Sequence, residues 1–187
     1  MVKKNSCVFI SGNGSNLKSL IRNSREYNFP INISLVVSNN PDAKGIFYAK
    51  KNSIPILIID TKKRNFENTI LKATRKYKIS IICLAGYMKI ISKKFIINFR
   101  KKIINIHPSL LPKFKGLNTF KRILKNNEKK TGCSVHFVNE KLDCGKIILQ
   151  KYFFIDKKKN VNILKYKTQK KEHLAFPEAI VKIYRYN

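Results

Sequence analysis

The residues best suited to chemistry lie in the stretch 105–112, where an apolar run ends in a loop bracketed by two prolines. Residues 102–106 alternate enough to predict a strand. His107 follows at its carboxyl end, which is where open α/β sheets place their ligands. Pro108 and Pro112 lock two φ angles, so the loop should present Asn105 and His107 in a set geometry. Catalysis is the first hypothesis for this stretch. The alternative is a histidine that packs or caps a turn, the more frequent role of a lone histidine beside proline.

A glycine-rich turn near the N-terminus has the pattern of a phosphate site. An apolar run at 7–10 predicts a buried strand, residues 17–21 open a helix, and the turn between them contains Gly12, Asn13, Gly14, Ser15 and Asn16. Glycines allow close approach of the backbone, Ser15 or Asn16 can cap the helix, and the N–H groups of the first helical turn can hold a phosphate. The pattern is neither G-x-G-x-x-G nor a P-loop. A plain glycine turn therefore stays open as the alternative.

Asp143 is a third candidate, in a connector at residues 139–145 between two predicted strands. The chain has only ten aspartates and glutamates, and most of the others lie on predicted helix surfaces or in lysine-rich stretches. A turn-forming aspartate is the alternative, and a common one. The four cysteines form no C-x-x-C pair, and Cys133 and His136 are three apart on a predicted strand, so we expect no metal site.

Strands and helices alternate along most of the chain, which predicts an α/β fold with a doubly wound, mostly parallel sheet. The run at 79–85 is the most continuously apolar and suits a parallel strand covered on both faces. Ser92 is a natural N-cap for the helix that follows. The predicted strands are 7–10, 33–37, 54–59, 79–85, 102–106, 131–138 and 147–154. The first predicted helix begins at residue 17, and the others cover 42–51, 66–77, 92–99, 118–126 and 172–186, the last broken near Pro177.

Length and composition indicate one domain, residues 1–187, that can bury a sizeable core. The cysteines, most of them in predicted strands, indicate a reduced chain of cytoplasmic type. The net charge of +30 suggests a nucleic acid or a membrane surface as partner. However, the excess consists of 33 lysines and only 7 arginines and is spread over the whole chain, whereas arginine is preferred for phosphate recognition. We therefore interpret the charge as the drift that an AT-rich genome produces, and we expect no specific nucleic-acid partner. The first apolar run is too short for a signal peptide or a membrane span, so we expect no membrane association.

Five pieces of the chain match one known family in order and spacing: residues 10–17, 84–88, 105–112, 134–138 and 142–145. With these pieces the chain resembles the glycinamide ribonucleotide formyltransferases, the folate-dependent transformylases of purine biosynthesis, over nearly its whole length. The loop around His107 is shared with other formyltransferases, whereas the turn at 12–16 points to the ribonucleotide branch. The resemblance implies a Rossmann-like formyltransferase fold with an antiparallel C-terminal extension. Residues 1–100 would form the nucleotide-phosphate half, and residues 101–187 the catalytic and folate-binding half.

The resemblance also implies a reaction, the transfer of a formyl group from the co-substrate 10-formyltetrahydrofolate to the amine of glycinamide ribonucleotide. Asn105, His107 and Asp143 match the catalytic trio of the family. Asn105 and His107 could stabilise the oxyanion that forms when the amine attacks. Asp143 beside His107 would favour the charged imidazole and organise a water relay for the proton that moves from the amine to N10 of the folate. No metal and no nucleophilic side chain is required, because the attacking amine belongs to the substrate.

The binding residues follow from the same resemblance. The ribonucleotide phosphate would be held by Gly12, Asn13, Gly14, Ser15 and Asn16, and its ribose by Glu172. The residues that would bind folate are Lys63, Arg64, Met88, Lys89, Ile90, Ile91, Asn105, Asn139, Glu140, Lys141 and Leu142.

Two positions depart from the family pattern. The folate-contacting arginine of the family aligns at Lys63 or, by a shift of one residue, at Arg64, and a lysine cannot hold a carboxylate bidentately. The usual Gly-Gly after the catalytic aspartate is here Cys144 followed by Gly145, so a Cβ enters a loop that could need glycine's freedom of φ. Either departure could weaken folate binding.

Two alternatives from other classes stay open. A methionyl-tRNA formyltransferase would share the His107 loop, but it needs a second, tRNA-binding domain for which 187 residues leave no room. A non-enzymatic RNA-binding protein on a relic formyltransferase fold would fit the charge of +30. It would be expected to interleave arginines and aromatics in a recognisable RNA module, which the chain lacks. Monomer and homodimer are both compatible with the sequence.

Overall fold

The computed structural model describes residues 2–156 and 160–185. The chain divides into two compact units, residues 1–104 and residues 105–187, and each is described by itself. Strand β5 (Lys102–His107) spans the division, so its last three residues, 105–107, open the second unit.

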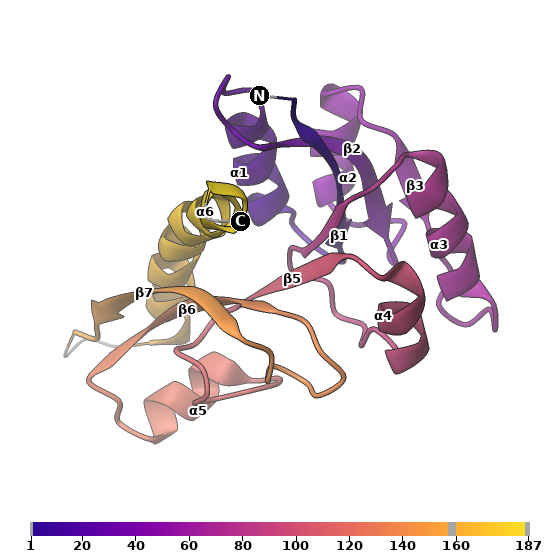
Figure 1. Cartoon of the computed structure of the whole chain (residues 1–187). Helices are drawn as coiled ribbons and strands as arrows, with labels where there is room; N and C mark the ends of the chain where they lie inside the picture. Colours follow the sequence, from indigo (N-terminus) through magenta and orange to yellow (C-terminus); the bar gives the residue numbers. More distant parts are fainter. Residues whose placement is uncertain (1, 157–159, 186–187) are drawn as a thin grey trace. The chain divides into compact units, whose positions relative to one another are not determined.

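The first unit alternates strands and helices as predicted, and its strand pairs are parallel (Figure 1). Its strand order, β3-β2-β1-β4, is the one expected of a doubly wound sheet. Its elements are β1 (Lys4–Ile10), α1 (Ser15–Ser24), β2 (Ile31–Ser38), α2 (Gly45–Lys51), β3 (Ile56–Ile58), α3 (Phe66–Lys76), β4 (Ile81–Leu84) and α4 (Lys93–Phe99).

The core of this unit explains why its central strands read as unbroken apolar runs. The side chains of 7–10 on β1 are fully buried, and those of 81–84 on β4 nearly so, as expected where helices cover both faces of a parallel sheet. Cys7 and Cys83 lie in these strands, and burial raises the pKa of both thiols. They are packing groups, as predicted.

The carboxyl ends of β1 and β4 lie level in the sheet, because Phe9 pairs with Leu84. The glycine-rich turn after β1 and the irregular segment after β4 therefore leave the sheet at the same edge. A hydrogen bond joins them directly, from the Met88 N–H to Ser11 Oγ at 2.8 Å. The glycine-rich turn, assigned by the resemblance to the ribonucleotide phosphate, and the segment after β4, assigned to the folate, are therefore neighbours within the first unit.

The second unit is built on the end of β5 and an antiparallel strand pair, in the strand order β5-β6-β7. Its further elements are α5 (Thr119–Lys125), β6 (Lys130–Phe137), β7 (Ile147–Phe154) and α6 (Val161–Arg185). Cys133 pairs with Lys151 in the register of β6 and β7, and α6 packs on both strands. The fold is therefore α/β with a mostly parallel sheet and an antiparallel C-terminal pair, which confirms the predicted class.

The last helix differs most from the prediction. It begins at Val161 rather than at 172, and it runs through Pro177 to Arg185 without a break; residue 186 lies outside the described part. Asn160 caps its start, since Asn160 Oδ1 accepts from the Ile163 N–H at 2.9 Å. Proline inside a helix costs about 3 kcal/mol, and here burial of the turn around Pro177 offsets that cost. In the described residues, no helix has the length and apolar character needed to cross a membrane.

Candidate active site

Three side chains singled out in the sequence, Asn105, His107 and Asp143, lie together in the second unit. Asn105 and His107 are two residues apart on β5, so their side chains point to the same face. Asp143 is in the loop between β6 and β7; its Oδ2 is 3.2 Å from His107 Nδ1 and its Oδ1 is 3.4 Å from Asn105 Nδ2. The fold thus brings His107 and Asp143 within hydrogen-bonding reach, as predicted.

Both ring nitrogens of His107 face oxygen acceptors. Nε2 is 2.9 Å from the Phe114 carbonyl oxygen, while Nδ1 faces the Asp143 carboxylate. A carbonyl oxygen only accepts, so Nε2 carries a proton and donates it. The second contact is satisfied when Nδ1 is also protonated or shares a proton with Asp143. The residue is 6% exposed, so this exchange takes place in a nearly dry environment.

Burial lowers the pKa of His107 below its ordinary value. The Phe114 carbonyl and the Asp143 carboxylate act in the opposite direction, while His136 and Arg122 lower the pKa further. Asp143 therefore acts on the ring in the direction predicted from the sequence, but burial outweighs it. The net direction of the His107 pKa is therefore downward, even though both ring nitrogens face oxygen acceptors.

Asp143 is held ionised by its neighbours. Burial alone would raise the pKa of Asp143, but the contacts with His136 and the Gly116 N–H and the charge of His107 lower it overall. The Gly116 N–H donates to Oδ2 at 2.9 Å, and His136 Nε2 is 3.6 Å from Oδ1. Asp143 adopts a left-handed backbone conformation with φ 50°, an arrangement that clusters at functional sites.

His136 is a member of the site that the sequence reasoning missed, since it was considered only as a metal ligand with Cys133. Its Nδ1 is 2.8 Å from the Phe137 carbonyl oxygen and so carries a proton. In the neutral ring Nε2 has a lone pair, which accepts from Asn105 Nδ2 at 3.2 Å. The signal was available, because residues 134–138 are one of the pieces that carry the family resemblance. Within residues 2–156 and 160–185 no cluster of side chains could hold a metal ion.

The Asn105 amide group already has two acceptors. Its Nδ2 donates to His136 Nε2 at 3.2 Å and to Asp143 Oδ1 at 3.4 Å. Both N–H bonds are therefore engaged, and a substrate oxygen must displace one acceptor to be bound. The longer contact, to Asp143, is the weaker and the easier to displace.

The loop at 108–112 is fixed by β6 as well as by its prolines. Ser134 Oγ donates to the Ser109 carbonyl at 2.7 Å and accepts from the Leu111 N–H at 2.9 Å. Gln150 Nε2 donates to the Leu111 carbonyl at 2.9 Å. Ser134 is fully buried, so these bonds are shielded from water. They attach the loop after His107 to the strand that carries His136.

The backbone strain expected at Cys144 is absent. The left-handed residue is Asp143, and Cys144 has no positive φ. Gly145 is the position that requires glycine, because a Cβ there would lie 1.7 Å from the Phe137 carbonyl oxygen. Cys144 is exposed, and its Sγ accepts from Lys115 Nζ at 2.8 Å.

The glycine-rich turn of the first unit ends in the start of α1. Gly14, with φ 71°, is the N-cap, and no side chain caps the helix, so the predicted cap by Ser15 or Asn16 is wrong. A Cβ on Gly14 would lie 2.4 Å from the Gly45 Cα, which explains why glycine is needed there. The first turn of α1 contains no acidic residue. Its N–H groups and the helix dipole therefore favour an anion at this end.

The segment 88–91 has the features of a surface for a flat, partly polar ligand. Met88 and Ile90 are 63% and 75% exposed, which is unusual for large apolar side chains. Between Met88 and Ser92 the described structure contains no hydrogen bond to the backbone groups of 89–91. Apolar side chains beside unpaired N–H and C=O groups can hold a heterocyclic ring and its polar edge together.

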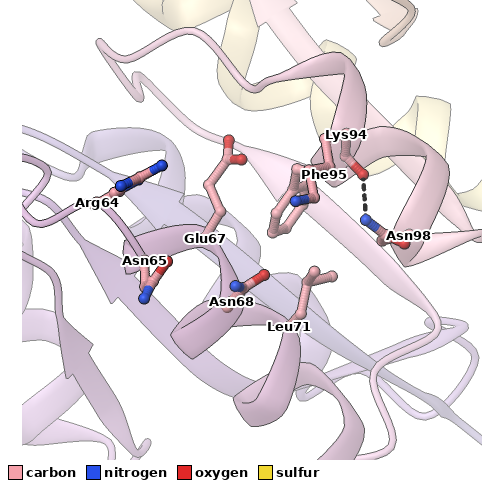
Figure 2. Close-up of a pocket in the computed structure, with 8 residues that line it drawn as sticks. All are labelled: Arg64, Asn65, Glu67, Asn68, Leu71, Lys94, Phe95 and Asn98. Atoms are coloured by element: carbon pink, nitrogen blue, oxygen red, sulfur yellow. Dashed lines mark hydrogen bonds between the residues drawn. The ribbon is translucent and has the colours of Figure 1, made fainter.

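Two side chains fix the ends of this segment. Ser11 Oγ accepts from the Met88 N–H and donates to Asn39 Oδ1 at 2.5 Å. At the other end, the Ser92 N–H and Oγ donate to the Glu67 carboxylate at 3.0 and 2.5 Å, while Ser92 Oγ accepts from the N–H of residue 95 at 3.0 Å. Ser92 is therefore the N-cap of α4, as predicted. Figure 2 shows Glu67 extending from α3 toward the start of α4.

Lys63 and Arg64, the two alternatives for a folate-contacting cation, have different surroundings. Arg64 lines a cavity of about 160 Å³ together with residues of α3 and α4, among them Asn68 and Lys94 (Figure 2). Lys63 is not among the residues that line this cavity, and its side chain is exposed. Of the two, Arg64 is the one that borders a hollow in the first unit.

The remaining residues named from the sequence lie in the second unit. The turn at 139–142 is closed by Asn139 Oδ1, which accepts from the Lys141 N–H at 3.0 Å, and Leu142 is 55% exposed. Glu172 lies on α6, near Cys133 of β6. Burial raises the pKa of the Cys133 thiol to about 12, and the charge of Glu172 adds to that rise.

Comparison with known proteins places this geometry in a family. The model of the formyl transferase family matches residues 4–180. A phosphoribosylglycinamide formyltransferase of Haemophilus influenzae is 38% identical over 183 residues, which cover 95% of this chain and 85% of that protein. The crystal structure of phosphoribosylglycinamide formyltransferase from Brucella melitensis superposes with a TM-score of 0.92 at 38% identity, covering 97% of this chain and 96% of that one.

Longer relatives also match. The human trifunctional purine biosynthetic protein adenosine-3 is 40% identical over 177 residues, and the chain spans only 18% of its length. The match therefore concerns one part of that protein. From the family model and from relatives of similar length, the chain belongs to the formyl transferase family and, within it, to the phosphoribosylglycinamide formyltransferases.

Proposed function

We propose that this chain transfers a formyl group from 10-formyltetrahydrofolate to the amine of glycinamide ribonucleotide, a step of de novo purine biosynthesis that leads to IMP. The observation that carries the proposal is the buried contact between His107 and Asp143, 3.2 Å apart, with Asn105 beside them. An ionised carboxylate beside a buried histidine can accept and pass on a proton, and an adjacent amide can donate to a developing oxyanion. These are the two demands of formyl transfer to an amine.

The reaction forms a bond between the substrate amine and the formyl carbon and breaks the bond from that carbon to N10 of the folate. Asn105 donates to the formyl oxygen as negative charge develops on it. The 3.4 Å contact to Asp143 is the one given up, while the 3.2 Å contact to His136 keeps the amide oriented. The cost of this exchange is small, because hydrogen bonds at the upper limit of distance contribute little.

Asp143 handles the proton. The attacking amine must lose one proton and N10 must gain one, so the net change is a transfer between the two nitrogens. Asp143 is ionised at neutral pH and accepts the proton directly or through water, since its pKa is lowered in the fold. Asp143 favours the charged form of the His107 ring and burial disfavours it, so the ring can exchange a proton with Asp143 during the transfer.

The substrates are assigned to the segments whose chemistry suits them. Residues 12–16 and the start of α1 take the ribonucleotide phosphate, and Glu172 takes the ribose. Residues 88–91, with 139–142 and Asn105, take the folate. Of Lys63 and Arg64, we assign Arg64 to its carboxylates, because Arg64 borders a cavity. No metal ion takes part.

The test is a formyl-transfer assay with purified protein, glycinamide ribonucleotide and 10-formyltetrahydrofolate. Product should form with both substrates present and not when either is omitted. Adenosine monophosphate in place of the ribonucleotide is the matched control, since it supplies the phosphate without the glycinamide amine. Absence of transfer from a folded preparation, judged by circular dichroism, would refute the proposal.

A further inference from the structure

The loop of residues 113–118, just before α5, supplies two backbone contacts to the candidate active site. The Phe114 carbonyl accepts from His107 Nε2 at 2.9 Å, and the Gly116 N–H donates to Asp143 Oδ2 at 2.9 Å. The position of this loop therefore sets both the ring of His107 and the carboxylate of Asp143. Contacts that hold the loop therefore also control the geometry of the His107–Asp143 pair.

The loop conformation is not one that its own residues prefer. Phe114 and Asn118 have φ values of 58° and 56°, in the left-handed region that non-glycine residues seldom adopt. Such conformations persist only where the surroundings enforce them. One contact comes from the first residue of α5, whose Thr119 Oγ1 donates to the Gly116 carbonyl at 3.1 Å. The loop therefore needs contacts from outside to stay in place.

Arg122 of α5 provides such contacts. Its Nη1 donates to the Lys115 carbonyl at 2.5 Å, and its guanidinium carbon lies 5.6 Å from the centre of the Phe114 ring. A planar guanidinium can donate and stack at once, which a lysine cannot. The two contacts fall on consecutive residues, directly between the carbonyl that meets His107 and the N–H that meets Asp143.

We propose that Arg122 is a positioning residue for the catalytic pair. It holds the 113–118 loop so that the Phe114 carbonyl and the Gly116 N–H reach their partners. This inference rests on the function proposed above. It adds a residue of α5 that lies outside the family-matching pieces.

The charge of Arg122 adds a second effect. It disfavours the protonated form of His107, as does His136, whereas Asp143 favours it. Removing the charge of Arg122 should therefore raise the apparent pKa values of the coupled His107–Asp143 pair, whichever group is protonated first. The two lysines of the loop have other partners: Lys113 pairs with Glu128 at 2.9 Å, and Lys115 contacts Cys144 at 2.8 Å.

Two variants separate the contact from the charge. Arg122→Leu removes the hydrogen bond, the stacking cation and the charge, whereas Arg122→Gln removes the charge and keeps an N–H donor for the Lys115 carbonyl. Lys121→Leu and Lys121→Gln are the matched controls, because Lys121 is the adjacent exposed cation on the same helix. The measurements are kcat and KM in formyl transfer, the pH profile of kcat/KM, and thermal stability.

We expect Arg122→Leu to lower kcat roughly tenfold. This effect lies between that of losing one hydrogen bond and the ~10²-fold effect of misplacing a reacting group. Arg122→Gln should lose less and should move the acid limb of the pH profile to higher pH. A residue that only stabilised α5 would lower the melting temperature without moving that limb. Kinetics of the Arg122 variants that equal those of the Lys121 controls would overturn the inference.

A readout independent of activity separates failure of this inference from failure of the proposed function. The chain has only three histidines, so the ring proton of His107 can be followed by NMR titration. Arg122→Gln should raise the pKa of His107 relative to Lys121→Gln, even in a protein that transfers no formyl group. An unshifted titration would overturn the link between Arg122 and the pair, whereas inactive wild-type protein with the expected shift would overturn the proposed function alone.

Discussion

Asp143→Asn is the sharpest test of the proposed chemistry, because it removes a charge and keeps the shape of the side chain. The remaining carbonyl oxygen can still accept from the Gly116 N–H, which lies 2.9 Å from Oδ2 in the wild type. The substitution mainly disrupts the long, weak hydrogen bond that Asn105 Nδ2 donates to the carboxylate. We therefore expect the variant to fold and to bind both substrates nearly as the wild type does.

The chemical step should suffer instead. The amine loses its proton acceptor and His107 loses the anion 3.2 Å away, so kcat should fall by ~10² to 10⁴, the range for general acid–base groups. The pair acts as one unit, so combining Asp143→Asn with His107→Ala should cost little more than the worse single change. The assay is steady-state formyl transfer with each substrate varied in turn. Glu178→Gln, which removes a carboxylate from the surface pair with Lys151, is the control.

The same variant should change how stability depends on pH. The pKa of Asp143 is lowered in the fold, so its carboxylate contributes stability above its unfolded pKa, and this is lost as pH falls toward the folded value. The pKa of His107 is lowered too, so the wild type also loses stability as pH falls below about 6.5, where the unfolded ring takes up its proton. The difference in unfolding free energy between wild type and Asp143→Asn, measured in urea, should therefore shrink on acidification below about pH 4. A kcat within a few-fold of wild type, or a difference that grows as the pH falls below about 4, would refute the role given to Asp143.

Three further outcomes are expected. Gly12→Val, at a position where a Cβ meets no atom within 4 Å, should raise KM for the ribonucleotide far more than it lowers kcat. Unchanged ribonucleotide KM in folded Gly12→Val would remove the turn from the site. Gly14→Val should instead fail to fold, because its Cβ would lie 2.4 Å from the Gly45 Cα. Ser11→Ala, which frees the Met88 N–H, should raise KM for the folate roughly five- to tenfold, and Ser6→Ala, which loses a comparable bond to a β2 carbonyl, should not. Nucleic acids should bind weakly, with dissociation constants of ~10⁻⁴ to 10⁻⁶ M at physiological salt and no preference for sequence; tight, selective RNA binding in a filter assay would contradict this.

The sequence by itself determined the class of fold and the main chemistry. Continuous apolar runs such as 81–84 are local patterns, and they predict buried parallel strands whatever the rest of the chain does. Residue type at strand ends is equally local, so His107 after β5 and the glycines after β1 could be selected in advance. Family resemblance added Asp143, which spacing alone left as a turn residue. A local pattern could not, however, foresee that α6 continues through Pro177, because burial of that turn is a tertiary effect.

What only the tertiary structure decided is how the selected residues are held. The partners of His107 and Asp143 are backbone groups of Phe114 and Gly116, and every residue has such groups, so no sequence pattern marks the ones that are used. The role proposed for Arg122 depends on those same backbone contacts. The direction of the His107 pKa shift was decided in the same way. The sequence supplied the Asp143 carboxylate, which raises that pKa, but not the burial, which lowers it by more. Desolvation depends on everything that surrounds a group, and that is known only once the chain has folded.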